Sequence, residues 1–560
     1  MTDPILRTAA ELDLDRGRVD SVVKLLDEGS TVPFIARYRK EVTGNADDAT
    51  VAKIAERVAF HREFEDRRAT ILKSIEEQGK LTKELRQQIE AATTKTVLED
   101  LYLPFRPKRR TRATIAKDRG LEPLADRMWA QADESGDVEA IVREFVDPMK
   151  EVPSSGDALQ GARDILAERA TETTTLRQLV RSLTRSEGVI ESKVARGKKD
   201  EASKFTDYYD FSERIDRIPP HRIHALLRGE KEGFLRLRVT ADPDRARQLL
   251  FDRVVGRRVS IWRDQLRKAL DDAHDRLLSH QIETEIRMDL RQRADEKAIG
   301  VFASNLEDLL MAPPFGGKPV LAIDPGLRTG CKVVILSGTG ALREHGLVHP
   351  TAPRKDVEGT ERALDAWFAK HDDVAAIAVG NGTGGRETFD VVQAWARDRG
   401  RHLPVVLVNE AGASVYSASE VAREELPDHD VTVRGAVSIG RRLQDPLAEL
   451  VKIDPKSIGV GQYQHDVDPK RLATSLGEVV ERCVNQVGVD VNTASPALLE
   501  YVSGLNARIA RAIVAHRDAA GGIGSRAELK KVKGLGAKTF EQAAGFLRVR
   551  GGHPLDDSAV

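Results

Sequence analysis

The sequence predicts a multidomain, mainly α-helical protein with an α/β domain in its second half. Three observations support this fold class. A length of 560 residues corresponds to about three or four domains of ~150 residues each. Apolar residues recur at helical spacing through most of residues 1–310. After residue 318 the spacing of the apolar residues changes, and short apolar runs typical of strands alternate with helical stretches.

Residues 1–315 are expected to form a helical region with helix-turn-helix-like and long-helix parts. One long charged helix is expected around 50–79, and a second helical stretch around 244–310. Between them, Glu191–Asp200 is expected to be a polar, basic loop. The Pro/Gly cluster Met311–Gly317 breaks the helical pattern and marks the first domain boundary.

Residues 318–452 are expected to form one α/β domain. The order strand, strand, strand, helix, strand, helix, strand, helix predicts an antiparallel meander extended by parallel units, the ribonuclease H-like arrangement. It places the strand ends at Asp324 and Asn381 side by side, where open α/β sheets bind ligands. Asp324 alone is weak support for a site, because Asp-Pro-Gly is also ordinary turn chemistry.

Strands are expected at 320–323, 332–336, 341–349, 374–379 and 405–408, with helices at 357–370, 387–399, 413–425 and 435–452.

Residues 453–560 are expected to form a helical domain with two similar turns about thirty residues apart. Gly and Asn tolerate backbone geometry that other residues avoid, and both turns are built from them. Such a turn directs backbone N–H groups and a helix N-terminus outward, where a phosphate can bind. The residues expected to contact nucleic acid are Gly504, Leu505, Asn506, Arg508, Lys533, Gly534, Leu535, Gly536 and Lys538.

The charge around these turns favours binding over a purely structural role. Residues 501–550 contain ten Lys or Arg and three Asp or Glu, a net charge of +7. One such turn would be an ordinary helical corner, whereas two in a basic segment favour a phosphate-binding module.

A second basic run lies in the helical region, between Phe105 and Lys117, and contains no acidic residue. It is a candidate phosphate contact, and the alternatives are an acidic partner or a solvated surface. Its candidate contacts are Arg106, Lys108, Arg109, Arg110 and Arg112. Arg37, Arg39 and Lys40 form a smaller group, for which a surface face is the favoured interpretation.

Net charge, cysteine content and the lack of long apolar runs limit the class of protein and its compartment. The net charge is −1, so any nucleic-acid surface must be a local patch. The two cysteines, Cys331 and Cys483, have neither disulfide-framework nor metal-ligand spacing, which favours a reducing compartment. The chain shows no signal pattern and no apolar run near the ~20 residues of a membrane span. A cytoplasmic protein with no membrane contact is expected.

Several of these segments resemble the Tex family of bacterial transcription accessory proteins, and the resemblance covers essentially the whole chain. They are Thr31–Gly44, Tyr102–Lys117, Val320–Gly330, Ala378–Gly385, Val408–Ser419, Arg441–Leu447 and Val489–Val549. The resemblance implies a YqgF/RuvC-type domain, a tandem helix-hairpin-helix domain, binding to RNA or DNA, and RNA polymerase or a transcription complex as candidate partner. Family members normally continue into a C-terminal OB-fold RNA-binding domain, so a truncated chain or fragment is expected.

The resemblance also raises the question of catalysis. A two-metal nuclease needs several carboxylates around Mg²⁺ or Mn²⁺. Asp324 is placed for this role, and the resemblance adds Glu410 and Asp445. Active resolvases of this fold carry Glu at the position of Asn381, and an amide brings no charge to a hard-cation site. The expectation is a non-enzymatic scaffold without cofactor or metal. The alternative is a metal-dependent, structure-specific nuclease using Asp324, Glu410 and Asp445.

Overall fold

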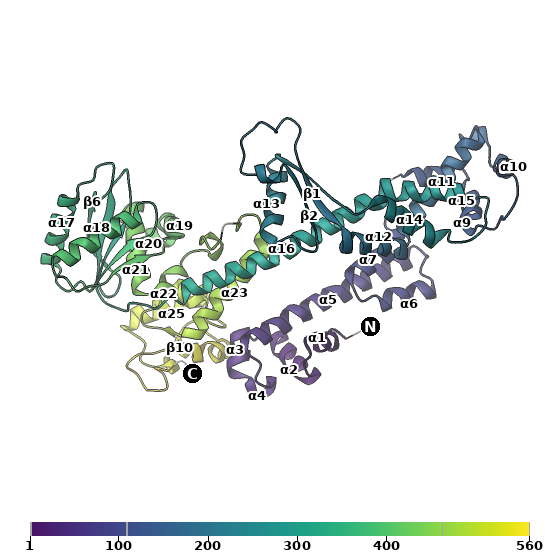
Figure 1. Ribbon diagram of the computed structural model, residues 1–560. Coiled ribbons are helices and arrows are strands. Elements are labelled where there is room, and N and C mark those ends of the chain that lie inside the picture. Colours follow the sequence, from purple (N-terminus) through teal and green to yellow (C-terminus); the bar gives the residue numbers. More distant parts are fainter. Residues whose placement is uncertain (1–2, 108–109, 462, 559–560) are drawn as a thin grey trace. The chain divides into compact units, whose positions relative to one another are not determined.

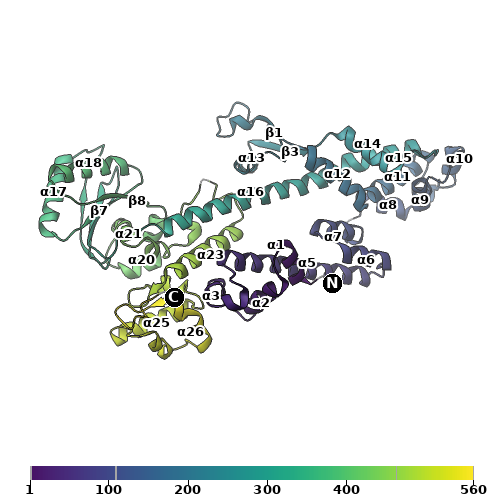
Figure 2. The same cartoon turned by 60° about the horizontal axis from the view of Figure 1, so that its bottom comes forward.

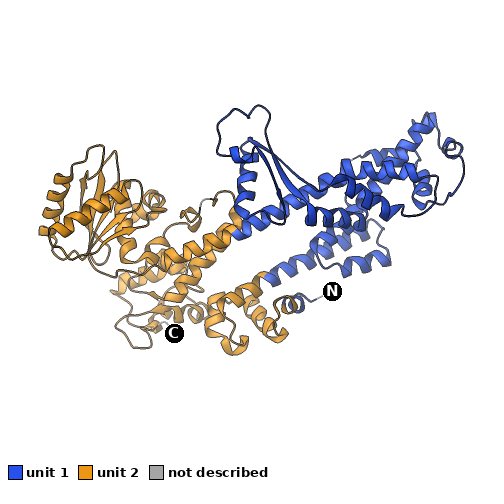
Figure 3. Cartoon of the chain, in the orientation of Figure 1, with its two compact units in different colours: residues 1–8, 57–297 blue, residues 9–56, 298–560 orange. Residues whose placement is uncertain are grey.

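The computed structural model describes residues 3–107, 110–461 and 463–558 (Figure 1). The chain divides into two compact units (Figure 3). The first unit contains residues 57–297 with the chain up to Thr8, and the second contains residues 9–56 and 298–560. Within the described residues, no helix is both long and apolar enough to cross a membrane.

The first unit is mainly helical and has a main core and a smaller cluster formed by α5, α6 and α7. Trp262, Leu166 and Leu250 are fully or almost fully buried at its centre. Its helices are α5 (Asp48–Glu77), α6 (Lys83–Ala91), α7 (Lys95–Tyr102), α8 (Arg112–Asp118), α9 (Glu122–Ala130), α10 (Val138–Arg143), α11 (Ser155–Glu172), α12 (Thr174–Glu187), α13 (Pro220–Lys231), α14 (Pro243–Val254), α15 (Arg263–Asp272) and α16 (Ser279–Leu310), with α5 and α16 continuing into the other unit. The two long helices expected from the sequence correspond to α5 and to α14–α16.

A small antiparallel sheet corrects the expectation that this region is helical nearly throughout. Strands β1 (Val189–Val194), β2 (Asp210–Arg214) and β3 (Leu235–Thr240) pair in the order β2-β1-β3. The segment Glu191–Asp200, expected to be a loop, therefore begins inside β1. In β3, buried Leu235, Leu237 and Val239 alternate with exposed Arg236 and Arg238, the period of a half-buried strand.

Acidic side chains cover the free edge of β3. The N–H of Val239 donates to Glu283 of α16 at 2.9 Å, and the N–H of Leu237 donates to Glu230 of α13 at 3.4 Å. These bonds satisfy backbone donors that would otherwise be open to another strand.

A buried charged network joins three helices of the first unit. Arg177 and Arg181 of α12 donate to Asp100 of α7 at 2.7 and 3.0 Å. Arg181 also donates to Glu285 of α16 at 2.6 Å. Asp100 is 4% exposed, so the carboxylate and both guanidiniums depend on one another for solvation.

The second unit contains the five-stranded α/β sheet predicted from the sequence. Its strands are β4 (Val320–Asp324), β5 (Cys331–Leu336), β6 (Leu342–Val348), β7 (Ala376–Gly380) and β8 (Val405–Val408). The order β6-β5-β4-β7-β8, antiparallel up to β4 and parallel beyond it, confirms the ribonuclease H-like arrangement. Strands β4 and β7 are neighbours, so Asp324 and Asn381 follow adjacent strand ends as expected.

Helices cover both faces of this sheet (Figure 2). Leu321 and Ile323 face α17 (Val357–Lys370) and α18 (Gly385–Asp398), whereas Val320 and Ala322 face α21 (Val431–Gln444). Because helices bury both faces of β4, its sequence is a continuous apolar run. The remaining helices of this part are α19 (Ala413–Ala418), α20 (Glu420–Glu425) and α22 (Pro446–Leu450).

The C-terminal part of the second unit is a helical domain closed by two short parallel strands. Strand β9 (Val489–Asp490) pairs with β10 (Leu547–Arg548) and brings together the two ends of the segment that holds both turns. Its helices are α23 (Pro469–Val487), α24 (Pro496–Glu500), α25 (Ala507–Ala520) and α26 (Ala537–Ala543), with 3₁₀ turns η6 (Arg526–Lys531) and η7 (Ala544–Phe546).

Helices from the start of the chain pack on this domain within the same unit. They are α2 (Arg16–Asp27), α3 (Val32–Tyr38) and α4 (Lys40–Thr43), and α1 (Pro4–Leu12) precedes them. The ring of Tyr38 meets Phe546 edge-on at 5.2 Å, and Arg37 donates to the carbonyl of Asn485 at 3.1 Å. Arg39 pairs with Glu541. Arg37 and Arg39, for which a surface face was the favoured interpretation, are partly exposed and contact another part of the chain, whereas Lys40 is exposed.

Candidate nucleic-acid interface

The two turns predicted from the sequence each connect two helical segments of the C-terminal domain. The first lies between α24 and α25, and the second between η6 and α26. Gly504 and Gly534 occupy equivalent positions with φ of +79° and +92°. Only glycine adopts these values without strain, so both turns need it at this position.

The third position of each turn has a different role from the one expected. Asn506 and Gly536 have φ of −140° and −78°, which any residue can adopt. Both are helix N-caps. Asn506 accepts a hydrogen bond from the N–H of Ile509 at 3.1 Å, whereas Gly536 has no side chain to cap α26. The interpretation that this position needs the backbone freedom of glycine is therefore wrong.

Both turns leave backbone donors unused. In each turn the leucine N–H is bonded within the turn, to Val502 or Val532. The other N–H groups of the turns and of the first helical residues have no hydrogen-bond acceptor among the described residues; they belong to Gly504, Asn506, Ala507, Gly534, Gly536 and Ala537. At the start of α26 no side chain competes for these positions. The second turn therefore offers the more open set of N–H groups for an anion.

The first turn is enclosed by other parts of the second unit. Asn485 accepts from the N–H of Ser503 at 2.9 Å and donates to the carbonyl of Tyr501 at 2.8 Å. The hydroxyls of Thr31 and Ser503 share a short hydrogen bond. A Cβ on Gly504 would lie 2.8 Å from the Cβ of Gln542. The first turn therefore serves mainly as a packing corner.

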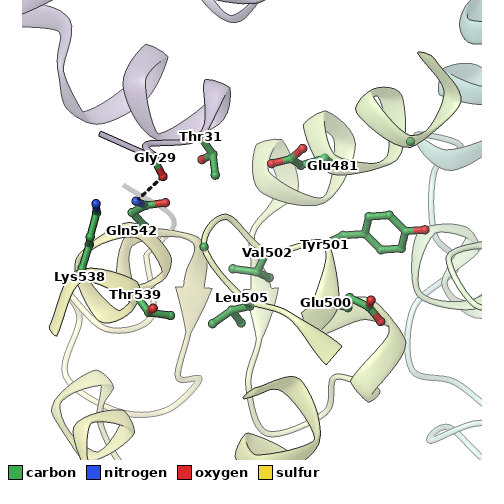
Figure 4. Close-up of a pocket in the computed structure, with 12 residues that line it drawn as sticks. Gly29, Thr31, Glu481, Glu500, Tyr501, Val502, Leu505, Lys538, Thr539 and Gln542 are labelled. Atoms are coloured by element: carbon green, nitrogen blue, oxygen red, sulfur yellow. Dashed lines mark hydrogen bonds between the residues drawn. The ribbon is translucent and has the colours of Figure 1, made fainter. Parts of the chain in front are cut away.

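A cleft of about 550 Å³ lies beside this corner (Figure 4). Its lining residues come from 29–31, from α23, from 500–505 and from 538–542 of the second unit. Gln542 donates across it to the carbonyl of Gly29 at 3.1 Å. Lys538, one of the predicted phosphate contacts, donates to the carbonyl of Glu28. Leu505 contributes to the wall and Leu535 is 8% exposed, so the two leucines pack rather than face solvent.

The structure separates the ten cations of residues 501–550 into two groups. Six of them contact protein groups: Arg517 and Arg526 donate to backbone carbonyls, Arg548 and Arg550 pair with Asp557 and Asp490, Lys538 donates to Glu28, and Lys530 lies over the ring of Phe540. Four exposed cations hold no hydrogen bond or ion pair among the described residues: Arg508, Arg511, Lys531 and Lys533.

These four cations, which we call the hairpin patch, lie around the second turn. Nη2 of Arg508 is 3.8 Å from the place of a Cβ on Gly534, so α25, the second helix of the first hairpin, reaches the turn of the other hairpin. Arg511 follows Arg508 by three positions on α25 and shares its face. Lys531 and Lys533 flank the buried Val532. The hairpin patch therefore combines free cations with the free N–H groups of the second turn.

The basic run at 105–117 keeps few free cations. Arg106 pairs with Glu99 and lies over the ring of Tyr102, and Lys117 pairs with Glu122 at 2.7 Å. Arg110 and Arg112 are exposed and hold no ion pair among the described residues. The predicted contacts Lys108 and Arg109 lie outside the described residues.

The carboxylates of the α/β domain form a pair at the strand ends. The side chain of Glu410 lies over Gly382, where a Cβ would be 1.6 Å from Oε1. Oδ1 of Asn381 accepts a hydrogen bond from the N–H of Glu410 at 3.2 Å. Burial and the charge of Glu410 raise the pKa of Asp324 to about 6, and Lys332 opposes this effect. Glu410, a candidate carboxylate from the resemblance, thus acts on Asp324 although it follows the next strand out.

Asp445 takes a separate structural role. It is the N-cap of α22, is exposed, and accepts a hydrogen bond from the N–H of Ala448 at 3.0 Å. The charges that act on Asp324 come from Glu410 and Lys332 and do not include Asp445. Across the described ranges, no group of three or more His, Cys, Asp or Glu residues is arranged to hold a metal ion.

Comparison with known proteins places these features in one family. Four family models match the chain: a Tex-like protein N-terminal domain at 2–76, a Tex central region-like model at 133–302, a Tex protein YqgF-like domain at 318–444, and a helix-hairpin-helix motif at 484–548. Protein tex of Bordetella pertussis is 50% identical over 99% of this chain and 72% of its own length. The chain belongs to the Tex family.

Other Tex-family relatives cover the same span. The transcriptional accessory protein Tex of Neisseria gonorrhoeae is 48% identical over 98% of this chain and 72% of its own length. The human S1 RNA-binding domain-containing protein 1 is 34% identical over 94% of this chain and 54% of its own length. The predicted family, fold class and helix-hairpin-helix module are confirmed. The boundaries 1–315, 318–452 and 453–560 stay predictions.

Proposed function

We propose that this Tex-family chain is a sequence-nonspecific nucleic-acid-binding accessory factor of transcription that acts as a non-enzymatic scaffold. The observation that carries the proposal is the hairpin patch, with four free cations beside the free N–H groups of the second turn. The helix-hairpin-helix match and the names of the relatives support nucleic acid and transcription as its setting.

The chemistry of the hairpin patch favours phosphate over bases. Backbone N–H groups and flexible cations recognise the phosphodiester chain, which is the same for every sequence. Binding should therefore depend strongly on salt and little on sequence, and both RNA and DNA are expected ligands. RNA polymerase, or a transcription complex that contains it, is the proposed partner.

Charge reversal in the hairpin patch tests this function. In Lys531→Glu/Lys533→Glu, the affinity for a single-stranded RNA or DNA should fall at least about tenfold. The slope of log affinity against log salt should drop by ~1.4, the value for two lost phosphate contacts on a single strand. Fluorescence anisotropy over a salt series measures both quantities.

Arg362→Glu supplies a control for charge reversal, with one reversed charge against two in the test variant. Arg362 is exposed on α17 and holds no ion pair among the described residues, so its reversal changes net charge without touching the hairpin patch. The control should bind as the parent does. Equal losses in both variants would show that overall charge, and not the hairpin patch, governs binding.

A second candidate function is metal-dependent cleavage, favoured by the contact of Glu410 with the strand end beside Asp324. Oε2 of Glu410 is buried and has no hydrogen-bond partner. Two carboxylates beside an amide do not fit a two-metal centre, which needs more acidic ligands. Incubation with branched and single-stranded DNA and RNA in Mg²⁺ or Mn²⁺ distinguishes the two functions. Cleavage that disappears in Asp324→Asn would overturn the scaffold proposal.

A further inference from the structure

A second cleft lies in the first unit, and none of the candidate nucleic-acid contacts named above lines it. The end of α9, the start of α12 and the turn after α14 enclose about 620 Å³, a size that suits a small ligand. Trp129 and Leu176 in its wall also pack in the main core of this unit, which fixes the shape of the cleft. None of the described residues that line it is acidic.

Three arginines give this cleft a concentrated positive charge. Arg253, Arg257 and Arg258 line it, are exposed, and hold no ion pair or hydrogen bond through their side chains among the described residues. The turn that carries them is held by Arg263, which donates to the carbonyl of Gly256 at 3.2 Å. Guanidinium groups gathered without a carboxylate are suited to a phosphoryl group, which they bind with paired hydrogen bonds.

The start of α12 adds an anion-binding helix end to the same cleft. This helix has 14 residues, and its N-cap Thr173 does not cap it, because Thr173 Oγ1 donates instead to the carbonyl of Arg169 at 2.8 Å. The N–H groups of Thr174 and Thr175 have no acceptor among the described residues. Thr173 and Thr175 line the cleft, so the positive end of the helix dipole opens into it.

A buried amide oxygen supplies an independent indication of a ligand. Gln131 is 7% exposed, and its Nε2 donates to the carbonyl of Val254 at 2.9 Å. Gln131 lines the same cleft, and its Oε1 is buried and accepts no hydrogen bond. Buried acceptors are normally paired, so this oxygen needs a donor from outside the chain. An anion carries no such donor, whereas a ribose hydroxyl or a base amino group does.

We propose that this cleft binds a nucleotide. The phosphate lies between the three arginines and the start of α12, Gln131 accepts from the ribose or the base, and Trp129 forms the adjoining wall. Two sources share this chemistry, a free nucleotide and the 5′-phosphorylated end of a nucleic-acid strand. The site is separate from the hairpin patch and stands whether or not the hairpin patch binds.

The test uses the full chain and two pairs of probes. In calorimetric titration, AMP should bind and adenosine should not if a free nucleotide is the ligand. If the ligand is a strand end, a 5′-phosphorylated RNA should bind Lys531→Glu/Lys533→Glu more tightly than the same RNA with a 5′-hydroxyl. That background reverses two of the four cations of the hairpin patch, and both RNAs meet the same patch, so the two proposals fail independently. The absence of a phosphate-dependent difference in both pairs would overturn the nucleotide site.

Three variants locate the binding. Arg257→Gln/Arg258→Gln should lower the affinity for the bound probe at least about tenfold. Thr175→Glu should do the same while keeping or raising the melting temperature, because an acidic residue in the first turn stabilises a helix but repels phosphate. Arg236→Gln removes another exposed, unpaired arginine of this unit, on β3, and should bind as the parent does. Unchanged affinity in both cleft variants would place the ligand elsewhere and overturn the proposal.

Discussion

At the scale of single residues, the second turn offers a matched pair of glycines. Gly534 has φ of +92°, whereas Gly536 has φ of −78° and open space where a Cβ would stand. Gly534→Ala should lower both the melting temperature and the affinity, because alanine is strained at positive φ. Gly536→Ala should leave the melting temperature unchanged and lower the affinity severalfold, because its methyl group occupies the approach to the free N–H groups. Thermal melting and anisotropy on the same samples measure both effects.

The result for Gly536→Ala decides between two roles of this turn. A variant that folds and binds as the parent does would show that no phosphate approaches the turn closely. The second turn would then be a helical corner, like the first. A variant that unfolds would contradict the geometry given above for Gly536.

Asp324 provides a residue-scale prediction on pH. Its pKa is raised from 3.8 to about 6, so the folded protein holds this proton over a range where the unfolded chain has lost it. The free energy of unfolding should therefore fall as pH rises from about 4 to 6, by at most ~3 kcal/mol. Asp324→Asn removes this loss, so the variant should melt above the parent at pH 7.5 and near it at pH 4.

A divalent cation should act in the opposite direction on the difference in melting temperature between the parent and Asp324→Asn. If Mg²⁺ binds the carboxylate pair, it should raise the melting temperature of the parent and not that of Asp324→Asn. Asp428→Asn, an exposed change in the same domain, should follow the parent in every condition. A parent that is more stable than Asp324→Asn at pH 7.5 without metal would contradict the burial argument.

At the scale of elements, the charged network of α7, α12 and α16 gives the largest expected effect on stability. Asp100→Ala leaves Arg177 and Arg181 buried without this carboxylate. Breaking a buried pair in this way costs about 3–5 kcal/mol. Chemical denaturation of the full chain should show the transition of the first unit at a lower denaturant concentration. Glu63→Ala removes an exposed pair with Lys95 of the same helix α7 and should change little.

The elements also show what could be read from the sequence. The helix at 357–370 and the strands of the five-stranded sheet followed from apolar runs bounded by Gly and Pro, and their bounds agree within a few residues. Strands β1–β3 were missed because they are short and rich in charge, although the alternation from Leu235 to Val239 was visible. The partners of the cations could not be predicted, because carbonyls such as that of Glu28 come from distant parts of the chain.

At the scale of the whole molecule, the net charge is close to zero, yet the chain contains two clusters of cations without a partner. The chain carries 88 Lys and Arg against 89 Asp and Glu, and most of the described cations are paired with nearby carboxylates or carbonyls. Four of the cations without a partner form the hairpin patch and three line the cleft at the start of α12, whereas others, such as Arg236 and Arg362, lie elsewhere in the described residues. Free cations in clusters therefore distinguish candidate binding surfaces from the solvated remainder better than sequence charge does.

The last prediction asks whether the basic run at 105–117 is a further contact for nucleic acid. Arg110 and Arg112 are its free cations among the described residues, whereas Lys117 of the same run is paired with Glu122. Arg110→Glu/Arg112→Gln should therefore weaken binding if both arginines contact phosphate. The slope of log affinity against log salt should then drop by ~1.4 on a single strand and by ~1.8 on duplex DNA. Lys117→Gln should change neither, since its charge is already compensated within the protein. Anisotropy over a salt series, on RNA and on DNA, measures the slopes. An unchanged slope in the double variant would assign this run to solvent or to an acidic protein partner, and phosphate binding would then depend on the hairpin patch.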